Sequence, residues 1–172
     1  MIRRCDERDF ETVLSIVNDS AEAYRGVIPA DCFGNPYMPR EELAGEIAAG
    51  VAFWAWEEDG ALAGVMGVQP VADVALIRHA YVRTTKQRRG IGGRLLRHIR
   101  SITDRPLLVG TWAAADWAVR FYRRYGFAPV PAPDTADVLR RYWDVPARQI
   151  ETSVVLAEQE WLKRRERAPG VR

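Results

Sequence analysis

Apolar side chains recur at helical spacing near the start of the chain. Asp6 can cap a helix, and a second acidic residue, Asp9, stands three positions later. The apolar positions that follow at helical spacing are Phe10, Val13, Leu14 and Val17. The pattern therefore predicts an amphipathic helix close to the N-terminus.

Four further helices are expected later in the chain. Pro39 stands at the start of one, and Gly50 can close it. A glycine-rich segment opens the next, with one apolar face formed by Leu95, Leu96, Ile99 and Ile102. Asp116 can cap the third, and Gly126 ends it. A shorter helix is expected over residues 134–142.

Strand-forming residues cluster between these helices. Residues 51–57, 61–69 and 74–82 are predicted as a three-stranded meander, because Asp59-Gly60 is a two-residue hairpin signal and a turn follows residue 69. Later strands are expected over residues 107–111, 127–130 and 149–157. Residues 18–38 show no clean period, so they are either a functional loop or short helical pieces. The order of elements is that of a mixed α and β domain.

Composition narrows the class of protein. The chain has 172 residues, which fits a single domain over residues 1–160 followed by a basic tail over 161–172. No apolar run is long enough for a membrane span, and the N-terminus has no apolar signal region, so a cytoplasmic protein is expected. Two cysteines (Cys5 and Cys32) and two histidines (His79 and His98) form neither a disulfide framework nor a metal site.

The segment over residues 82–93 carries the clearest chemical signal. A strand leads into a glycine-rich turn that becomes a helix N-terminus, where free amides and the helix dipole attract an anion. Two arginines, Arg88 and Arg89, add positive charge there. A dinucleotide fingerprint would need a glycine where Leu95 stands, and the Gly-Lys-Ser/Thr of a Walker A loop is absent.

Two motifs together resemble a known family. Gln87-x-x-Gly90-x-Gly92 resembles the pyrophosphate loop of the GNAT superfamily of acyl-CoA N-acyltransferases, and residues 118–127 resemble its second motif, a helix that ends in Tyr-x-x-x-Gly-Phe. Their order, their spacing and the strand between them also agree. This chain departs from the family at three positions. The family often has Pro where this chain has Thr84, an aromatic residue where it has Lys86, and Asn where it has Ala115.

The resemblance implies a fold and a cofactor. The fold is α+β, with a central, mostly antiparallel sheet that splays at a parallel pair formed by residues 77–82 and 107–111, and helices on both faces. Acetyl-CoA is the implied co-substrate, with no metal. The implied cofactor-binding residues are Val82 beside the pantetheine arm and, in the loop, Gln87, Arg88, Arg89, Gly90, Gly92 and Gly93.

The resemblance also implies an acyl transfer to a primary amine of a small molecule. Tyr122 matches the position that often protonates the leaving thiolate, although a helical wheel also allows it to be a core residue beside Ala118. The residue that deprotonates the amine stays open between His79, a carboxylate such as Glu57 or Asp73, and water.

Residues 18–38 are expected to form part of the acceptor site. Tyr24, Phe33 and Tyr37 would wall a pocket, and Glu22 or Asp31 would pair with the cationic amine.

Two other functions would explain parts of the sequence. A nucleic-acid-binding domain would explain the basic run over residues 86–100, but no aromatic residues interleave with those charges, so neither nucleic acid nor membrane is expected as a partner. A module that binds CoA as a sensor without turnover is the second alternative. The oligomeric state is left open, with a homodimer as one alternative.

Overall fold

The computed structural model describes residues 1–167. Their contacts group into two compact units: Met1–Pro70 with Ile77–Asp104, and Val71–Leu76 with the chain from Arg105 onward. The strand that both units share is β4 (Val74–Val82). Each unit is described by itself below.

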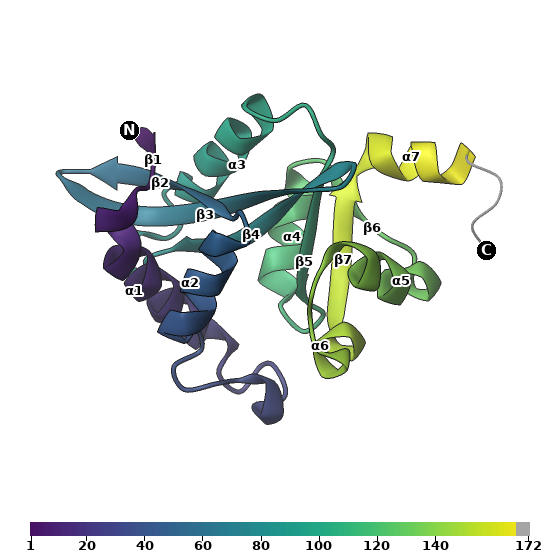
Figure 1. The fold of residues 1–172 in the computed structure, drawn as a ribbon, viewed down its shortest axis with the longest axis horizontal. Helices are drawn as coiled ribbons and strands as arrows, with labels where there is room; N and C mark the ends of the chain where they lie inside the picture. Colours follow the sequence, from purple (N-terminus) through teal and green to yellow (C-terminus); the bar gives the residue numbers. More distant parts are fainter. Residues whose placement is uncertain (168–172) are drawn as a thin grey trace. The chain divides into compact units, whose positions relative to one another are not determined.

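The first unit combines four strands with helices (Figure 1). Its strands are β1 (Ile2–Arg4), β2 (Ala52–Glu58), β3 (Ala61–Val71) and β4 from Ile77. Its helices are α1 (Phe10–Ala21), α2 (Arg40–Ala48) and α3 (Ile91–Ser101), with short 3-10 turns η1 (Glu7–Asp9), η2 (Glu22–Tyr24), η3 (Ala30–Cys32) and η4 (Thr84–Lys86). The 3-10 pieces η2 and η3 show that residues 18–38 hold short helical segments, one of the two expected alternatives.

The hairpin between β2 and β3 is the one that the sequence predicts. Glu58 pairs with Ala61 across a two-residue turn. Asp59 and Gly60 both have positive φ, 53° and 73°, which a tight turn between twisted antiparallel strands requires.

Alternation along β2 places helices on both of its faces. Phe53 and Ala55 are buried in a core with α1 residues such as Ile16. The side chain of Trp54 points the other way, with its ring 4.3 Å from the ring of His98 on α3. Successive residues of a strand face opposite sides, so α1 and α3 lie on opposite faces of β2.

The second unit is built around a long antiparallel pair. Its elements are β5 (Leu107–Trp112), α4 (Asp116–Arg124), β6 (Phe127–Pro129), α5 (Ala132–Tyr142), α6 (Ala147–Thr152), β7 (Ser153–Glu158) and α7 (Gln159–Arg167). β7 pairs with β5 on one side and with β6 on the other, both antiparallel. Leu108, Val138 and Val155 contribute to its buried core, together with Val74 and Leu76 at the start of β4.

The strand order of the seven-stranded sheet is β1-β2-β3-β4-β5-β7-β6. Its one parallel pair is β4 with β5, and its other pairs are antiparallel. The expected α+β fold with a mostly antiparallel sheet and one parallel pair is therefore confirmed. Of the described residues, no helix is both long and apolar enough to cross a membrane.

Several expected boundaries are wrong, for local reasons. α1 continues to Ala21, because Ser20 is buried and its hydroxyl donates to the carbonyl of Val82, 2.7 Å away. Residues 149–152 are helical, not extended, because Pro146 caps α6 and β7 begins only at Ser153. Asp116 is the first residue of α4, and Ala115 occupies the capping position.

One apolar side chain and the C-terminal segment also differ from expectation. Ile102 is 45% exposed, because α3 ends one residue before it. Trp117 is 41% exposed, whereas Tyr122 is the residue of α4 that is buried. The expected basic tail over 161–172 begins inside α7, whose Trp161 is buried. Residues 168–172 of that tail lie outside the described residues, and the single domain over 1–160 stays a prediction.

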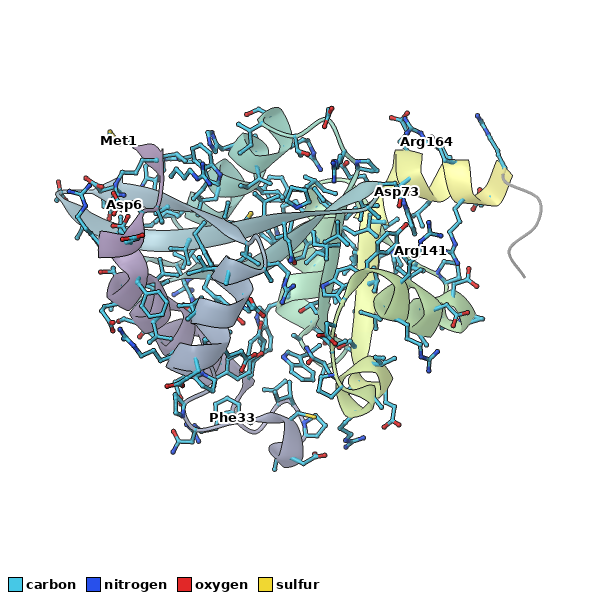
Figure 2. All side chains as sticks on the ribbon, viewed as in Figure 1. Met1, Asp6, Phe33, Asp73, Arg141 and Arg164 are labelled. Atoms are coloured by element: carbon cyan, nitrogen blue, oxygen red, sulfur yellow. The ribbon has the colours of Figure 1, made fainter. Side chains whose placement is uncertain are left out.

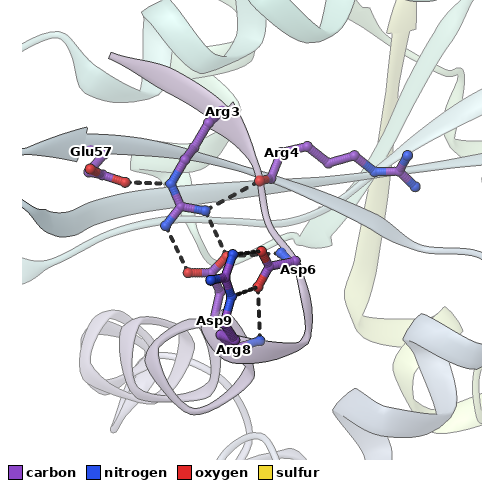
Figure 3. Close-up of polar contacts among 6 residues, drawn as sticks. All are labelled: Arg3, Arg4, Asp6, Arg8, Asp9 and Glu57. Atoms are coloured by element: carbon purple, nitrogen blue, oxygen red, sulfur yellow. Dashed lines mark hydrogen bonds and ion pairs between the residues drawn. The ribbon is translucent and has the colours of Figure 1, made fainter.

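A network of charged side chains fixes the N-terminus to β2 (Figure 3). Arg3 donates two hydrogen bonds to the carboxylate of Asp9, at 2.7 and 2.8 Å, and a third to Glu57 on β2. Asp9 also accepts from the backbone N–H of Asp6, which completes the capping box of η1. The hydrogen bond from Arg3 holds the pKa of Asp9 below its usual range. Nearby, burial raises the pKa of the Cys5 thiol to about 12.

Arg3→Met should destabilise the fold by about 1–3 kcal/mol at neutral pH, because it leaves the poorly exposed Asp9 carboxylate without its partner. A lowered folded pKa gives stability that is present above the unfolded pKa of about 3.9 and is lost as pH falls through the folded value. The difference in unfolding free energy between the unmodified chain and the Arg3→Met variant should therefore persist down to about pH 4 and shrink below it. Urea titrations across pH measure this.

The matched control is Arg8→Met, which removes an arginine that is 90% exposed and pairs with Asp6. Its stability should be nearly that of the unmodified chain, because exposed ion pairs contribute little. Equal destabilisation by both changes would contradict the role given to Arg3.

Candidate active site

The glycine-rich turn after β4 has the backbone of an anion site. Arg88 and Gly90 have positive φ, 61° and 76°, so the chain reverses sharply and enters α3 directly. Gly90 occupies the capping position of α3, and no described side chain caps this helix end. The first amides of α3 are therefore open to an external acceptor, which the helix dipole favours if it is negative.

Hydrogen bonds to α1 and to the end of β4 fix the entry to this turn. The carbonyl of Val82 accepts from the hydroxyl of Ser20 at 2.7 Å and from the side chain of Gln87 at 3.2 Å. The carboxylate of Asp19 accepts from the backbone N–H of Thr84 at 2.8 Å and from its hydroxyl at 3.2 Å. Gln87 thus braces the loop against its own strand.

The cations of the loop differ in their partners. Glu58, at the end of β2, binds the ammonium of Lys86 at 2.6 Å and lies 3.4 Å from the guanidinium of Arg89. The hydrogen bond from Lys86 lowers the pKa of Glu58, so this carboxylate is ionised at neutral pH. Arg88 is exposed and makes no ion pair with the described residues. The structure therefore brings Gln87, Arg88, Arg89 and Gly90 together in one turn, with a carboxylate beside it.

Tyr122 lies in the second unit. It is 5% exposed, and its ring contacts Phe121 and Phe127 with centroid distances of 5.0 and 5.6 Å. α4 ends at Arg124, and Gly126 turns the chain with a φ of 86° into β6. The side chain is thus embedded among aromatic rings, as the core alternative expected. Its catalytic role stays a prediction.

The aromatic residues of 18–38 gather in the first unit. Tyr24 lies 5.4 Å from Tyr37 and 6.3 Å from Tyr81 on β4, centroid to centroid. Phe33, labelled in Figure 2, lies 5.6 Å from Tyr37 and beneath the guanidinium of Arg25. Asn18 closes the segment by reciprocal hydrogen bonds with the backbone of Met38. The three rings lie together, and the pocket that they are expected to wall stays a prediction. Glu22, one of the two carboxylates expected to bind the amine, pairs with Arg25 at 2.7 Å.

The candidates for deprotonating the amine have different surroundings. Glu57 accepts from Arg3, as described above. Asp73 accepts from the hydroxyl of Tyr142 at 2.9 Å and lies 3.7 Å from Arg141. Asp73 and Arg141 are labelled in Figure 2. His79 is hydrogen-bonded through Nε2 to Glu46 on α2. Glu57 and Asp73 are thus occupied by structural pairs within the chain.

One expectation about β4 is wrong. Alternation would place Arg78 and His79 on opposite faces of the strand, yet both contact the carboxylate of Glu46. The cause is the backbone of His79, whose φ of 47° interrupts the alternation.

A family model described as an acetyltransferase (GNAT) domain matches residues 16–140. The chain belongs to the GNAT acetyltransferase family. A comparison with curated protein sequences finds no match.

Solved structures of GNAT acetyltransferases share this fold. The PaiA N-acetyltransferase from Thermoplasma acidophilum, in complex with coenzyme A, has a TM-score of 0.69 and 17% identity, over 92% of this chain and 97% of that chain. The ribosomal-protein-S18-alanine N-acetyltransferase from Escherichia coli has a TM-score of 0.63 and 18% identity, over 92% of both chains. The N-acetylglutamate synthase from Neisseria gonorrhoeae, complexed with coenzyme A and N-acetyl-glutamate, has a TM-score of 0.61 and 22% identity. That similarity covers 92% of this chain and 34% of that chain.

Two glutamates near the candidate site of this GNAT domain were not predicted from the sequence. Glu58 stands beside the hairpin turn, and Glu46 stands on α2 three positions after the buried Leu43. Each looks like an ordinary surface glutamate in the sequence, since its partners are 28 to 33 positions away. No group of three or more metal-ligating side chains occurs within residues 1–167.

Glu58→Gln should tighten CoA binding roughly two- to fivefold at low salt, because it removes a negative charge that competes for Lys86 and Arg89. The gain should shrink as ionic strength rises. Calorimetric titration with CoA measures both effects.

Glu160→Gln is the matched control, since it makes the same charge change at an exposed pair with Arg164 on α7. It should leave the affinity unchanged. Weaker binding by Glu58→Gln would show that the carboxylate orients the cations instead of competing with the ligand.

Proposed function

We propose that this GNAT domain transfers the acetyl group of acetyl-CoA to a primary amine of a small molecule, by direct attack of the amine on the thioester. The observation that carries the proposal is the uncapped N-terminus of α3, which follows the left-handed Gly90 and has Arg88 and Arg89 beside it. Coenzyme A in two of the similar structures supports the choice of cofactor.

The loop binds the pyrophosphate of the cofactor in this proposal. Amides of Gly92, Gly93 and their neighbours donate to phosphate oxygens, and the arginines supply charge. Gln87 and Asp19 keep the loop in its binding conformation before the ligand arrives, since both hydrogen-bond to the chain itself. A loop ordered in advance loses less entropy on binding.

The chemistry needs a proton at the sulfur. Attack by the amine nitrogen on the carbonyl carbon breaks the C–S bond, and the electron pair leaves on sulfur as a thiolate. We assign its protonation to Tyr122, which occupies the family position for this role. A positioned general acid contributes about 10²–10⁴ in rate.

The direct test is a panel of small primary amines with acetyl-CoA, with release of free thiol as the readout. Thiol release that depends on an amine, with an acetylated product of the expected mass, supports transfer. Tight CoA binding without thiol release by any amine would favour the alternative function, a module that senses CoA.

Gly92→Asp should abolish CoA binding, because it places a negative charge among the amides that would bind the pyrophosphate. The helix itself should survive, since an acidic residue in the first turn is favoured by the helix dipole. Calorimetric titration with CoA measures the loss, and circular dichroism checks the fold. Unchanged affinity would remove the loop from the cofactor site.

Tyr122→Phe should lower kcat by roughly 10²–10⁴ while the KM for acetyl-CoA changes little. The ring and its contacts with Phe121 and Phe127 remain, while the hydroxyl that would donate the proton is removed. An alkaline decline in rate, as the phenol ionises, should vanish in the variant. Steady-state kinetics across pH measures both.

Tyr125→Phe on the same helix is the matched control and should keep kcat. A Tyr122→Phe protein with full kcat and a lower melting temperature would show a core tyrosine whose hydroxyl only stabilises the fold.

A further inference from the structure

A partly buried polar cluster joins α2 to β4 within the first unit. The carboxylate of Glu46 accepts a hydrogen bond from Arg78 at 2.5 Å through Oε1 and contacts His79 Nε2 through Oε2. Arg78 also donates to the side chain of Gln69 at 2.9 Å. The three charged side chains are only 13–18% exposed. A carboxylate that is bound on both oxygens cannot rotate freely, so it fixes the imidazole.

The contact with Glu46 sets the tautomer of His79. An ionised carboxylate accepts from an N–H, so in the neutral ring Nε2 carries the proton and Nδ1 carries the lone pair. Nδ1 has no hydrogen-bond partner among the described residues. Within that same part of the chain, His98 Nε2 is the buried side-chain polar atom without a partner, so Nδ1 of His79 is open to solvent. The ring therefore presents a fixed, accessible proton acceptor.

The backbone of His79 is strained to make this arrangement. Its φ of 47° lies in the left-handed region, which is uncommon for residues other than glycine. The neighbouring strand β3 packs closely against this part of β4, because a Cβ on Gly67 would lie 2.9 Å from the carbonyl oxygen of Arg78. A strained residue with a solvent-facing lone pair is more typical of a functional position than of simple packing.

The surroundings of His79 suit an amine. Its ring stacks with Phe53 and with Tyr81, at centroid distances of 6.1 and 6.4 Å, and Tyr81 leads to the aromatic wall of Tyr24 and Tyr37. The titratable and charged groups that face it are Glu46, Glu42, Arg78 and Tyr81. Burial opposes ionisation of Glu46, but His79 and Arg78 outweigh it and lower its pKa. Burial raises the pKa of Glu42, and that of Tyr81 well above its usual range.

We propose that His79 takes the proton from the acceptor ammonium through Nδ1, and that Glu46 is the positioning residue that orients the ring and balances its charge. The proposal rests on the function proposed above and names the base for that reaction.

The step balances without another reactant. An N–H bond of the ammonium breaks, and the proton moves to Nδ1. The freed lone pair of the amine then attacks the thioester carbon. The imidazolium, paired with the Glu46 carboxylate, later returns its proton to solvent. A base of this kind is needed when the acceptor is protonated at the assay pH, and much less when the acceptor is already neutral.

The test compares two acceptors in the full chain with acetyl-CoA. Benzylamine is mostly protonated at neutral pH, and 2,2,2-trifluoroethylamine is mostly neutral. His79→Gln keeps an N–H for Glu46 but has no basic nitrogen. With benzylamine, kcat should fall about 10²–10⁴-fold and the acid limb of the pH profile should disappear. With trifluoroethylamine the loss should be much smaller.

Glu46→Gln tests the positioning role. It should move the acid limb for benzylamine to lower pH, because the imidazolium loses its counter-charge, while the KM for acetyl-CoA stays the same. His98→Gln is the matched control, since it removes the other histidine of the chain, and it should keep kcat and the acid limb. If His79→Gln does not fold, His79→Asn replaces it, because asparagine tolerates a positive φ.

Full kcat in the folded His79 variant, or an equal loss with both amines, would overturn the proposal and leave the proposed function intact. A His79 variant that binds CoA normally, but whose kcat falls as predicted with benzylamine alone, would support the proposal. If the unmodified chain binds CoA but acetylates neither these two nor any amine of the panel, the proposed function fails and this proposal fails with it.

Discussion

The turn from β4 into α3 is the constraint on which the candidate cofactor site depends. Gly90 sits in the left-handed region at the capping position of α3, where no described side chain satisfies the first amides. Uncapped amides at a helix end must be satisfied by water or by a ligand. The surrounding contacts from Ser20 and Asp19 keep the turn in place, so the helix end stays available for an anion.

Carboxylates of the first unit serve mainly to hold arginines, lysines and histidine in defined positions. Asp9 and Glu57 hold Arg3, Glu58 holds Lys86 near Arg89, and Glu46 holds both Arg78 and His79. These pairs differ in exposure, and this decides their physical effect. Glu58, whose side chain is 27% exposed, mainly adjusts the local charge of the loop, whereas Glu46, at 18%, restricts the geometry of a titratable ring.

The two proton-handling candidates have contrasting environments. Tyr122 packs against Phe121 and Phe127 and is only 5% exposed. Such burial is as typical of a core residue as of a catalytic one. His79 has a carboxylate on one nitrogen, an open second nitrogen and a strained backbone. The sequence placed the histidine among several alternatives for the base, and these contacts are the ground on which we propose it.

The sequence by itself determined the features that are encoded locally. The Asp59-Gly60 turn, the limits of β4 and the glycine loop before α3 depend on nearby residues. The motif in that loop and the second motif over residues 118–127 were together enough to indicate the family. Only the tertiary structure decided which carboxylates meet which cations. Glu46 and His79 are 33 positions apart, and their contact requires both the packing of α2 and the break in alternation at His79. A local pattern cannot encode such a contact, because it depends on how distant segments pack together.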